Sequence, residues 1–352
     1  MNIDRESVIR TQMELSNLMG CPGHEEEVTD YIMMRLEKLT VDKAWIDPLG
    51  NVLAIKEGTD PNGLRILLDG HVDEVGFMIS HISDNGFITV TTLGGIDKRI
   101  ILGTLVQFQS SNGERIIGVF GASPPHITKQ DEREKVPDIS DMFVDIGCDS
   151  YEEVIETGLD IGSVGTFYVE SIQLNDKTIL GKAFDDRTAC NVILHVLEIL
   201  SDQEIPNTIL VNFAVQEEVG LRGATVGAFT LDPSIALAVE NTMACDVPGV
   251  SPQKTITKLG GGPAVTAADR SLIVPKKILE RIKEAAGKDE IKWQYKKPAY
   301  GGTDAGRISL TKSGVPSGVV SVPCRYIHST AGILLVDDII NTIKLVSNFC
   351  KI

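Results

Sequence analysis

Apolar runs in this sequence end repeatedly in histidine or carboxylate side chains, the residue types that bind divalent metals. The residues concerned are His71 and Asp73 after "RILLDG", Glu217 and Glu218 after "NFAVQ", Glu240 after "ALAV" and His328 after "VVSVPCRYI". A helix start, "GKAFDDRTAC", adds Asp185 and Asp186. A random distribution would place Ser, Asn or Lys at several of these positions. The pattern therefore predicts one shared site.

A set of five His and carboxylate ligands exceeds what one ion with an open position needs. It suits two ions that share one bridging carboxylate, roughly 3.5–4 Å apart. Such a pair lowers the pKa of a bound water, which makes hydroxide available near neutral pH. The residue types fit zinc, cobalt or manganese. The predicted chemistry is hydrolysis, which also needs a proton acceptor that is not itself a ligand.

The adjacent pair Glu217 and Glu218 fits this need. Neighbouring residues of an extended segment point to opposite sides, so the two carboxylates are not expected to form one bidentate ligand. We expect one of them to bind metal and the other to face the substrate and take a proton from water. An isolated pair of glutamates more often begins a solvated loop, but the other acids at the run ends argue against that explanation here.

The elements that must position these residues alternate between strands and helices. Strand-like apolar runs cover 64–70, 208–216, 234–242, 291–297 and 314–324, and helical patterns cover 188–202, 274–289 and 334–350. This alternation predicts an α/β fold with a mostly parallel sheet covered by helices on both faces. Ligands of such sheets gather at the carboxyl ends of the strands, where the candidate residues lie.

The middle third of the chain has a different residue pattern. Short β-rich runs are separated by Gly, Asn-Gly and Ser, with only a brief acidic helical stretch near 151–157. We interpret 73–167 as an inserted small β-rich domain. The catalytic domain is then formed by 1–72 together with 168–352.

The charge balance excludes some partners. Lys and Arg total 33 against 49 Asp and Glu, a formal net charge of −16, so neither nucleic acid nor an anionic membrane surface is an expected partner. No apolar run is long enough to span a bilayer, and the first residues lack the features of a secretory signal. Six scattered cysteines without a CxxC pair indicate reduced thiols and favour a cytoplasmic location.

Six sequence blocks, taken together and in order, resemble a known family: "LDGHVDEVGFMI", "GKAFDDRTA", "QEEVGLRGA", "DVPG", "GGTDA" and "RYIHS". They are similar to the motifs of the glutamyl, deblocking and tetrahedral aminopeptidases, and the similarity runs from about residue 10 to the end. The resemblance implies an enzyme with two divalent ions per subunit that removes N-terminal residues from small peptides. It also implies that the inserted domain, PDZ-like or a barrel, serves self-association, from dimers up to a hollow dodecamer.

The resemblance assigns individual roles. It implies catalytic roles for Glu217, as the general base, and for Asp73, as the acid that orients a histidine ligand. It implies metal binding, with Asp185 bridging both ions, by His71, Asp185, Glu218, Glu240 and His328. Glu240 departs from the family pattern, in which aspartate is common, and Asp246 in "ACDVPG" is a rival for its role.

Other candidate residues have structural explanations as well. Asp186 is equally expected to support a ligand or to cap a helix. Thr303 and Asp304, in a Gly-rich loop before a helix, are expected to line the site. His24 is expected at the surface near a helix start, and structural roles are expected for His81, His126 and His195.

Two further functions stay open. A glycosidase also uses a pair of acids, but it needs no paired histidines, and an aromatic content of 5% is low for sugar stacking. A non-catalytic oligomeric binding protein with a decayed site is supported only by the departure at Glu240. The residue preference at the substrate's N-terminus is not predicted.

Overall fold

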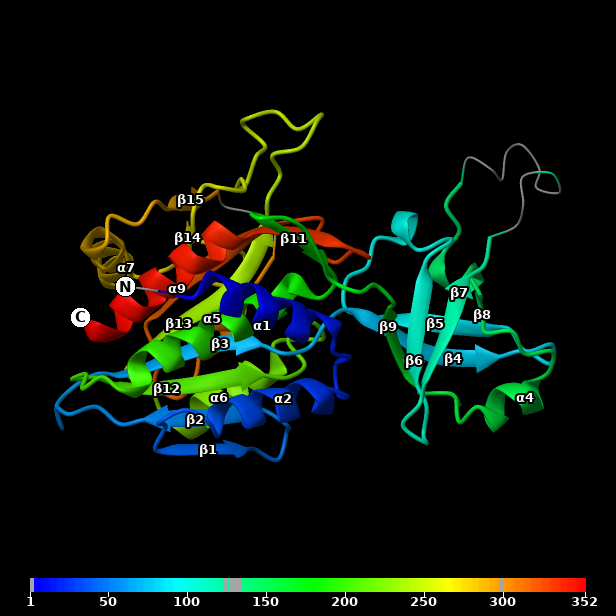
Figure 1. Cartoon of the computed structure of the whole chain (residues 1–352), viewed down its shortest axis with the longest axis horizontal. Helices are drawn as coiled ribbons and strands as arrows, with labels where there is room; N and C mark the ends of the chain where they lie inside the picture. The colour runs from blue at the N-terminus through cyan, green and yellow to red at the C-terminus, as the bar shows by residue number, and fades with distance from the viewer. Residues whose placement is uncertain (1–2, 123–125, 127–134, 298–300) are drawn as a thin grey trace.

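The structure is a computed structural model that describes residues 3–122, 126, 135–297 and 301–352. Figure 1 shows two parts, a large α/β part that contains both chain ends and a small β part on one side. The chain enters the β part after β3 and returns to the α/β part before β10.

The α/β part is built on an 11-stranded sheet whose order is β1-β2-β12-β3-β13-β16-β17-β11-β10. Its centre is parallel: β12 (Thr208–Ala214), β3 (Arg65–His71), β13 (Ile235–Met243) and β16 (Ser317–Arg325). Antiparallel strands extend the edges: β1 (Lys43–Ile46), β2 (Val52–Lys56), β17 (Gly332–Leu335), β11 (Thr178–Gly181) and β10 (Ile172–Asn175). A side branch joins β16 through β14 (Ala264–Thr266), which pairs in turn with β15 (Gln294–Lys296).

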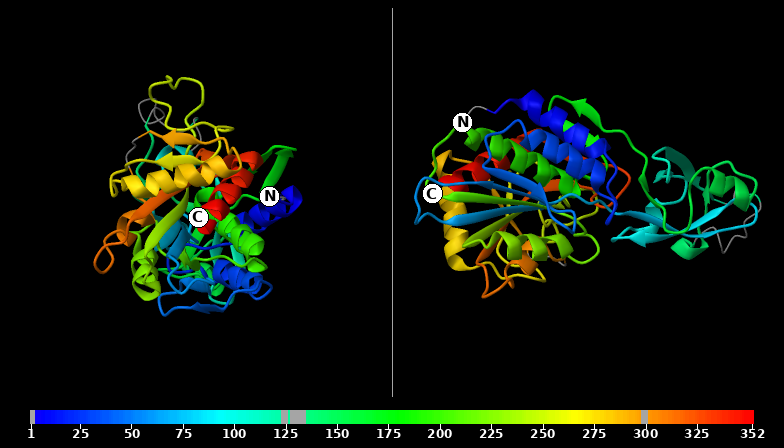
Figure 2. Two further views of the ribbon diagram at one scale, coloured as in Figure 1. Left: turned by 90° about the vertical axis from the view of Figure 1, so that its left-hand side faces the viewer. Right: turned by 90° about the horizontal axis from the view of Figure 1, so that it is seen from below.

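Helices cover both faces of this sheet, as Figure 2 shows. One layer contains α1 (Arg5–Asn17), α2 (Glu26–Leu36), α5 (Phe184–Ser201), α7 (Lys276–Lys288) and α9 (Val336–Lys351). The opposite face carries α6 (Arg222–Leu231) and α8 (Asp304–Ile308). Because the central strands are covered on both faces, they are continuous apolar runs; all seven residues of β12 are buried.

The β part is a closed antiparallel barrel of order β4-β5-β8-β7-β6-β9. Its strands are β4 (Gly76–Ile82), β5 (Ile88–Leu93), β6 (Leu105–Gln109), β7 (Arg115–Phe120), β8 (Val144–Asp145) and β9 (Val164–Phe167). Phe77 lies at the centre of its separate core, with ring centroids 4.9 Å from Phe120 and 5.2 Å from Phe167. The described part of the barrel also contains the short helices η1 (Lys98–Ile100), η2 (Ile139–Asp141) and α4 (Tyr151–Glu156).

The predicted fold class is confirmed, including the barrel between two halves of the α/β part. The sequence pattern does not predict α6, because "RGATVGAFTL" is rich in Gly, Thr and Val, which are weak helix formers. Burial of Ala224, Ala228 and Leu231 against the sheet stabilises this helix instead. All six cysteines are unpaired. In the ranges described above, no helix combines the length and apolar character needed to cross a membrane.

Candidate metal centre

The predicted residues meet at the carboxyl ends of the central strands. His71 is the last residue of β3, and Glu240 lies within β13. The loop after β12 carries Glu217 and Glu218, the loop after β16 carries His328, and the first turn of α5 carries Asp185. Parallel strands end at the same edge of a sheet, which explains why residues so distant in sequence converge.

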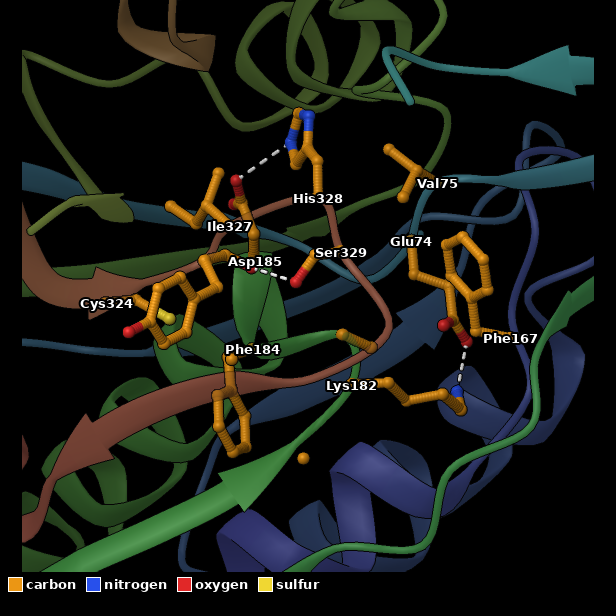
Figure 3. A pocket seen from close by; sticks show the side chains of 14 residues that line it. Glu74, Val75, Phe167, Lys182, Phe184, Asp185, Cys324, Ile327, His328 and Ser329 are labelled. Carbon is orange, nitrogen blue, oxygen red and sulfur yellow. Dashed lines mark hydrogen bonds and ion pairs between the residues drawn. The ribbon is translucent and has the colours of Figure 1, made fainter. Parts of the chain in front are cut away.

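Asp185 lies between the two histidines. Its Oδ1 is 3.3 Å from Nε2 of His71, and its Oδ2 is 3.1 Å from Nε2 of His328. Figure 3 shows the second of these contacts. His328 Nε2 also lies 3.0 Å from Glu218 Oε1, and His71 Nε2 lies 3.9 Å from Glu217 Oε2. The two oxygens of one carboxylate therefore face two different imidazoles.

Among the described residues, potential ligand atoms gather in three groups, and within each group they lie no more than 4.8 Å apart. Two groups share Asp185, and they consist of His71, Asp185 and Glu240, and of Asp185, Glu218 and His328. The third consists of His71, Glu217 and Glu218. A donor set of imidazole nitrogens and carboxylate oxygens fits zinc, cobalt or manganese.

Both imidazoles turn Nε2 toward this cluster, because backbone carbonyls engage the other nitrogen. His71 Nδ1 lies 3.1 Å from the carbonyl oxygen of Asp73, and His328 Nδ1 lies 3.0 Å from that of Gly95. A carbonyl oxygen accepts only from an N–H, so each contact places a proton on Nδ1, and Nε2 is the nitrogen that would lose its proton to bind a metal. This arrangement is the one that a histidine ligand needs.

The loop that supplies Gly95 follows β5 of the barrel. Gly94, in the same loop, has a φ of 83°. A Cβ added there would lie 2.8 Å from Val75 and 3.2 Å from the Cβ of Glu218, so the loop backbone packs directly against the site. A side chain at this position would be strained in conformation and also displace Glu218.

The site has more negative than positive groups. Five carboxyl groups (Asp73, Asp185, Glu217, Glu218 and Glu240) surround two histidines, so the fully ionised set would carry three excess negative charges even with both imidazoles protonated. Burial lowers the pKa of His328, but contacts with Asp185 and Glu218 outweigh this effect and raise it to about 11. Burial raises the pKa of Glu240 well above its usual value. Bound cations would relieve both effects, because they favour the carboxylate and the neutral imidazole.

One buried oxygen supports the same interpretation. Glu218 Oε1 has no aligned hydrogen bond within the described ranges, although it lies near His328. A buried carboxylate oxygen without a hydrogen bond carries a desolvation cost that a metal ligand does not. The residues present thus fit a metal centre.

Asp73 holds the pair of glutamates in place. Its Oδ1 accepts a hydrogen bond from the backbone N–H of Glu217 at 2.9 Å, and its Oδ2 accepts one from that of Glu218 at 3.0 Å. Oδ1 is also 3.5 Å from His71 Nδ1. One fully buried carboxylate therefore orients both the loop after β12 and a candidate ligand at the end of β3.

The structure distinguishes Glu240 from Asp246, the other candidate for the same ligand position. Glu240 is buried in the cluster, where its Oε1 accepts a hydrogen bond from the backbone N–H of Asp304 at 3.2 Å. Asp246 instead forms a bidentate pair with Arg325, at 2.9 and 2.7 Å, and belongs to none of the ligand groups.

Of the remaining candidates, some lie beside the ligand cluster and the others lie away from it. Asp186 is fully buried and accepts a hydrogen bond from the backbone N–H of His71 at 3.3 Å, and it does not cap α5. Thr303 lines the cavity over the cluster. His195 contacts Asn191 and Ser7 within the helix layer, as expected of a structural residue. The others lie outside the cluster: His24, His81 and His126.

A buried ion network behind the site is not predicted from the sequence. Lys182 Nζ lies 2.6 Å from Glu74 Oε1 and donates to the carbonyl of Leu18 at 2.9 Å, as Figure 3 shows for the pair. Arg187 donates to the carbonyl of Val72 at 2.6 Å. These contacts join α1, the end of β3 and the start of α5, which carry or support the ligands. No local pattern signals them, because the partners are more than a hundred residues apart in sequence.

The cluster opens into a cavity of about 360 Å³. Its walls come from the ends of β13 and β15, from the loop before α8 and from the loop after β16. A cavity of this size lies at the small end of the range for ligand sites.

Comparison with known proteins identifies close relatives of the chain. It is 34% identical to the glutamyl aminopeptidase of Lactococcus lactis, with 92% of this chain and 90% of the relative covered. It is 32% identical to the lysyl aminopeptidase of Pyrococcus furiosus, with 93% and 92% covered.

Solved structures agree with this relationship. A TET aminopeptidase from a marine sediment thaumarchaeote superposes with a TM-score of 0.94 at 38% identity, covering 98% of this chain and 96% of the other. A TET peptidase of Pyrococcus horikoshii, which can assemble into a tetrahedron or a large octahedral shell, gives 0.86 at 29% identity, covering 97% and 99%. A Thermotoga maritima structure described as an endoglucanase gives 0.79 at 34% identity, covering 97% and 96%. The model of the M42 glutamyl aminopeptidase family matches residues 50–345, and the chain therefore belongs to this family.

Proposed function

We propose that the protein is an aminopeptidase that binds two divalent ions in this cluster and hydrolyses the first peptide bond of small peptides. The observation that carries the proposal is the position of Asp185. Its two oxygens face two histidine-containing ligand groups, which is what a carboxylate shared by two ions requires. Family membership supports the choice of peptides as the substrate class.

The proposed ligands are His71 and Glu240 for one ion, Glu218 and His328 for the other, and Asp185 for both. When bound, the ions supply Lewis acidity that polarises the scissile carbonyl and makes water a stronger acid. The carboxylates of the cavity would hold the free amine of the substrate, which is positively charged before it binds. This recognition of the amine is what limits cleavage to the N-terminus.

Glu217 is the proposed proton carrier. Its side chain lies 3.9 Å from His71, and its backbone is fixed by Asp73, so the carboxylate is held beside the cluster. Burial, together with the neighbouring carboxylates, raises the pKa of Glu217 to about 8, although His71 acts in the opposite direction. Bound cations would bring this pKa down. Glu217 can then take a proton from the attacking water and deliver it to the leaving amine.

A metal-by-substrate matrix tests the proposal. We expect the chelated protein to be inactive on aminoacyl anilides, and zinc, cobalt or manganese to restore turnover. Absence of turnover with every metal would overturn it. A soluble glucan should remain intact with both the chelated and the metal-loaded protein. Glucan hydrolysis that survives chelation would instead support a glycosidase, the activity suggested by the similar structure that is described as an endoglucanase.

We also propose that the subunits self-associate. The barrel exposes Leu102, Leu105 and Ile117 on its surface. Exposed apolar side chains of this kind are suited to an interface between copies. Light scattering should give a mass that is a multiple of 38.1 kDa, and a mass equal to one chain at micromolar concentration would contradict the proposal. The predicted reduced, cytoplasmic setting is compatible with six unpaired cysteines.

A further inference from the structure

Lys296 places a lysine side chain at the cavity over the proposed metal centre. The cavity is lined by the candidate metal ligands and also by Met243, Lys296 and the glycines at 301 and 302. Among the described lining residues, Lys296 is the single lysine or arginine. It is partly buried, at the end of the short strand β15.

The strand geometry directs this side chain toward the cavity. Tyr295 points to the layer of α7, where the ammonium of Lys283 lies 5.6 Å from its ring. Side chains alternate along a strand, so Lys296 leaves the opposite face of β15.

The strand register gives the separation of β15 from β13, the strand that carries Glu240. Glu240 pairs with Ser321, which pairs with Ala264, which pairs with Gln294 of β15. Three strand spacings of about 4.8 Å separate the backbone of β15 from that of β13, or roughly 14 Å. Lys296 therefore lies across the cavity from the carboxylates that are proposed to hold the substrate amine.

The ammonium of Lys296 has no anionic partner in the described ranges, since no carboxylate oxygen lies within 4.0 Å of it. Its neighbour Lys297 differs, because its Nζ donates to the carbonyls of Pro252 and Gln253 at 2.7 and 3.4 Å. A partly buried cation without an anion is costly unless a ligand supplies one. The cavity therefore favours a substrate group that is negatively charged.

We propose that Lys296 is a specificity-determining residue, which binds the side-chain carboxylate of an acidic N-terminal residue. This inference rests on the proposed function. The cavity is small, so its interior meets the first residue of a peptide while the remainder leaves through the opening. The roughly 14 Å between the strands favours the longer acid, and glutamate is preferred over aspartate.

Family membership does not decide this preference. A glutamyl and a lysyl aminopeptidase are both similar to this chain, over nearly the same share of its length. A lysine side chain in the cavity would face the like charge of Lys296, which disfavours it. The identity of residue 296 thus distinguishes between two activities that the comparisons leave open.

The test compares anilides of glutamate, aspartate, glutamine, leucine and lysine with the metal-loaded enzyme. We expect kcat/KM for glutamate to exceed that for glutamine by about 10–100-fold, the range for a hydrogen bond to a charged group. Lys296→Met should remove this preference, mainly by raising KM for the glutamate anilide. It should change kcat/KM for the glutamine and leucine anilides by no more than about threefold. Lys296→Arg should keep most of the preference, and Lys296→Glu should favour the lysine anilide. Lys297→Met is the matched control and should change nothing.

A binding measurement provides a second readout. Calorimetry with free glutamate and free glutamine should show the same discrimination, and Lys296→Met should abolish it. An unchanged ratio of glutamate to glutamine in Lys296→Met overturns the inference.

Lys296 could bind either the side-chain carboxylate of the first residue or the C-terminal carboxylate of a short peptide. Comparing a dipeptide that begins with leucine with its C-terminal amide distinguishes these two cases. If Lys296→Met slows only the free dipeptide, Lys296 binds the C-terminal carboxylate and the inference is wrong. If glutamine and leucine anilides are cleaved without a preference for glutamate, the inference fails while the proposed function stands. If no anilide is cleaved with any metal, both fail.

Discussion

Replacing Glu217 with glutamine is expected to lower kcat by about 10²–10⁴-fold, the usual contribution of a general base. Glutamine keeps the size and hydrogen-bonding shape of the side chain but cannot accept a proton from water. Because Glu217 is proposed not to bind metal, the metal content should stay at two ions per subunit. Steady-state kinetics and elemental analysis of the same sample measure both quantities.

The pH profile sharpens this test. The base must be deprotonated to act, so kcat/KM of the wild type should rise with pH through the pKa of Glu217. That pKa is raised to about 8 by burial before the influence of cations, which lower it. The pH profile of the Glu217→Gln variant should lack this rise in kcat/KM. Glu204→Gln makes the same change at an exposed position and should leave the profile intact. A Glu217→Gln enzyme with full activity, or one that has lost its metals, would contradict the assigned role.

Replacing Asp185 with asparagine is expected to reduce metal binding at both positions. An amide offers one ligand oxygen and no charge, so it cannot bridge two cations as the carboxylate does. Loss of a residue that only supports a ligand typically costs 10–100-fold in affinity or activity, and we expect a larger loss here. Elemental analysis after gel filtration should find fewer than two ions, and metal-induced thermal stabilisation should shrink accordingly.

The control lies at the other end of the same helix. Asp202→Asn changes an exposed acid at the C-terminus of α5 and should retain both ions and activity. Retention of two tightly bound ions by Asp185→Asn would show that another residue bridges them. The third ligand group, which contains Glu217 and Glu218, would then be the alternative to consider.

The convergence of most candidate ligands could be predicted because they obey a simple rule of parallel sheets. Each strand end is visible as the end of an apolar run, and the runs that end in histidine or acid must converge when the strands are parallel. The same rule could not separate Glu240 from Asp246. That distinction depends on Arg325, which pairs with Asp246, and such a pairing is visible only in three dimensions.

Other features escaped prediction for physical reasons. Helix α6 is stabilised by burial rather than by propensity. Lys296 lies on an ordinary-looking strand, and only the branch of the sheet through β14 brings it to the cavity. The network of Lys182, Glu74 and Arg187 depends on contacts between segments far apart in sequence.

The barrel loop at Gly94 and Gly95 makes the geometry of the candidate ligands depend on the orientation of the barrel. The carbonyl of Gly95 is the partner of His328 Nδ1, and the backbone of Gly94 packs against Glu218. A small swing of the barrel would therefore rotate one imidazole and shift one carboxylate of the same ligand group. If copies of the barrel hold one another in an assembly, that restraint extends to the ligands. Assembly would then restrain the geometry of the group formed by Asp185, Glu218 and His328.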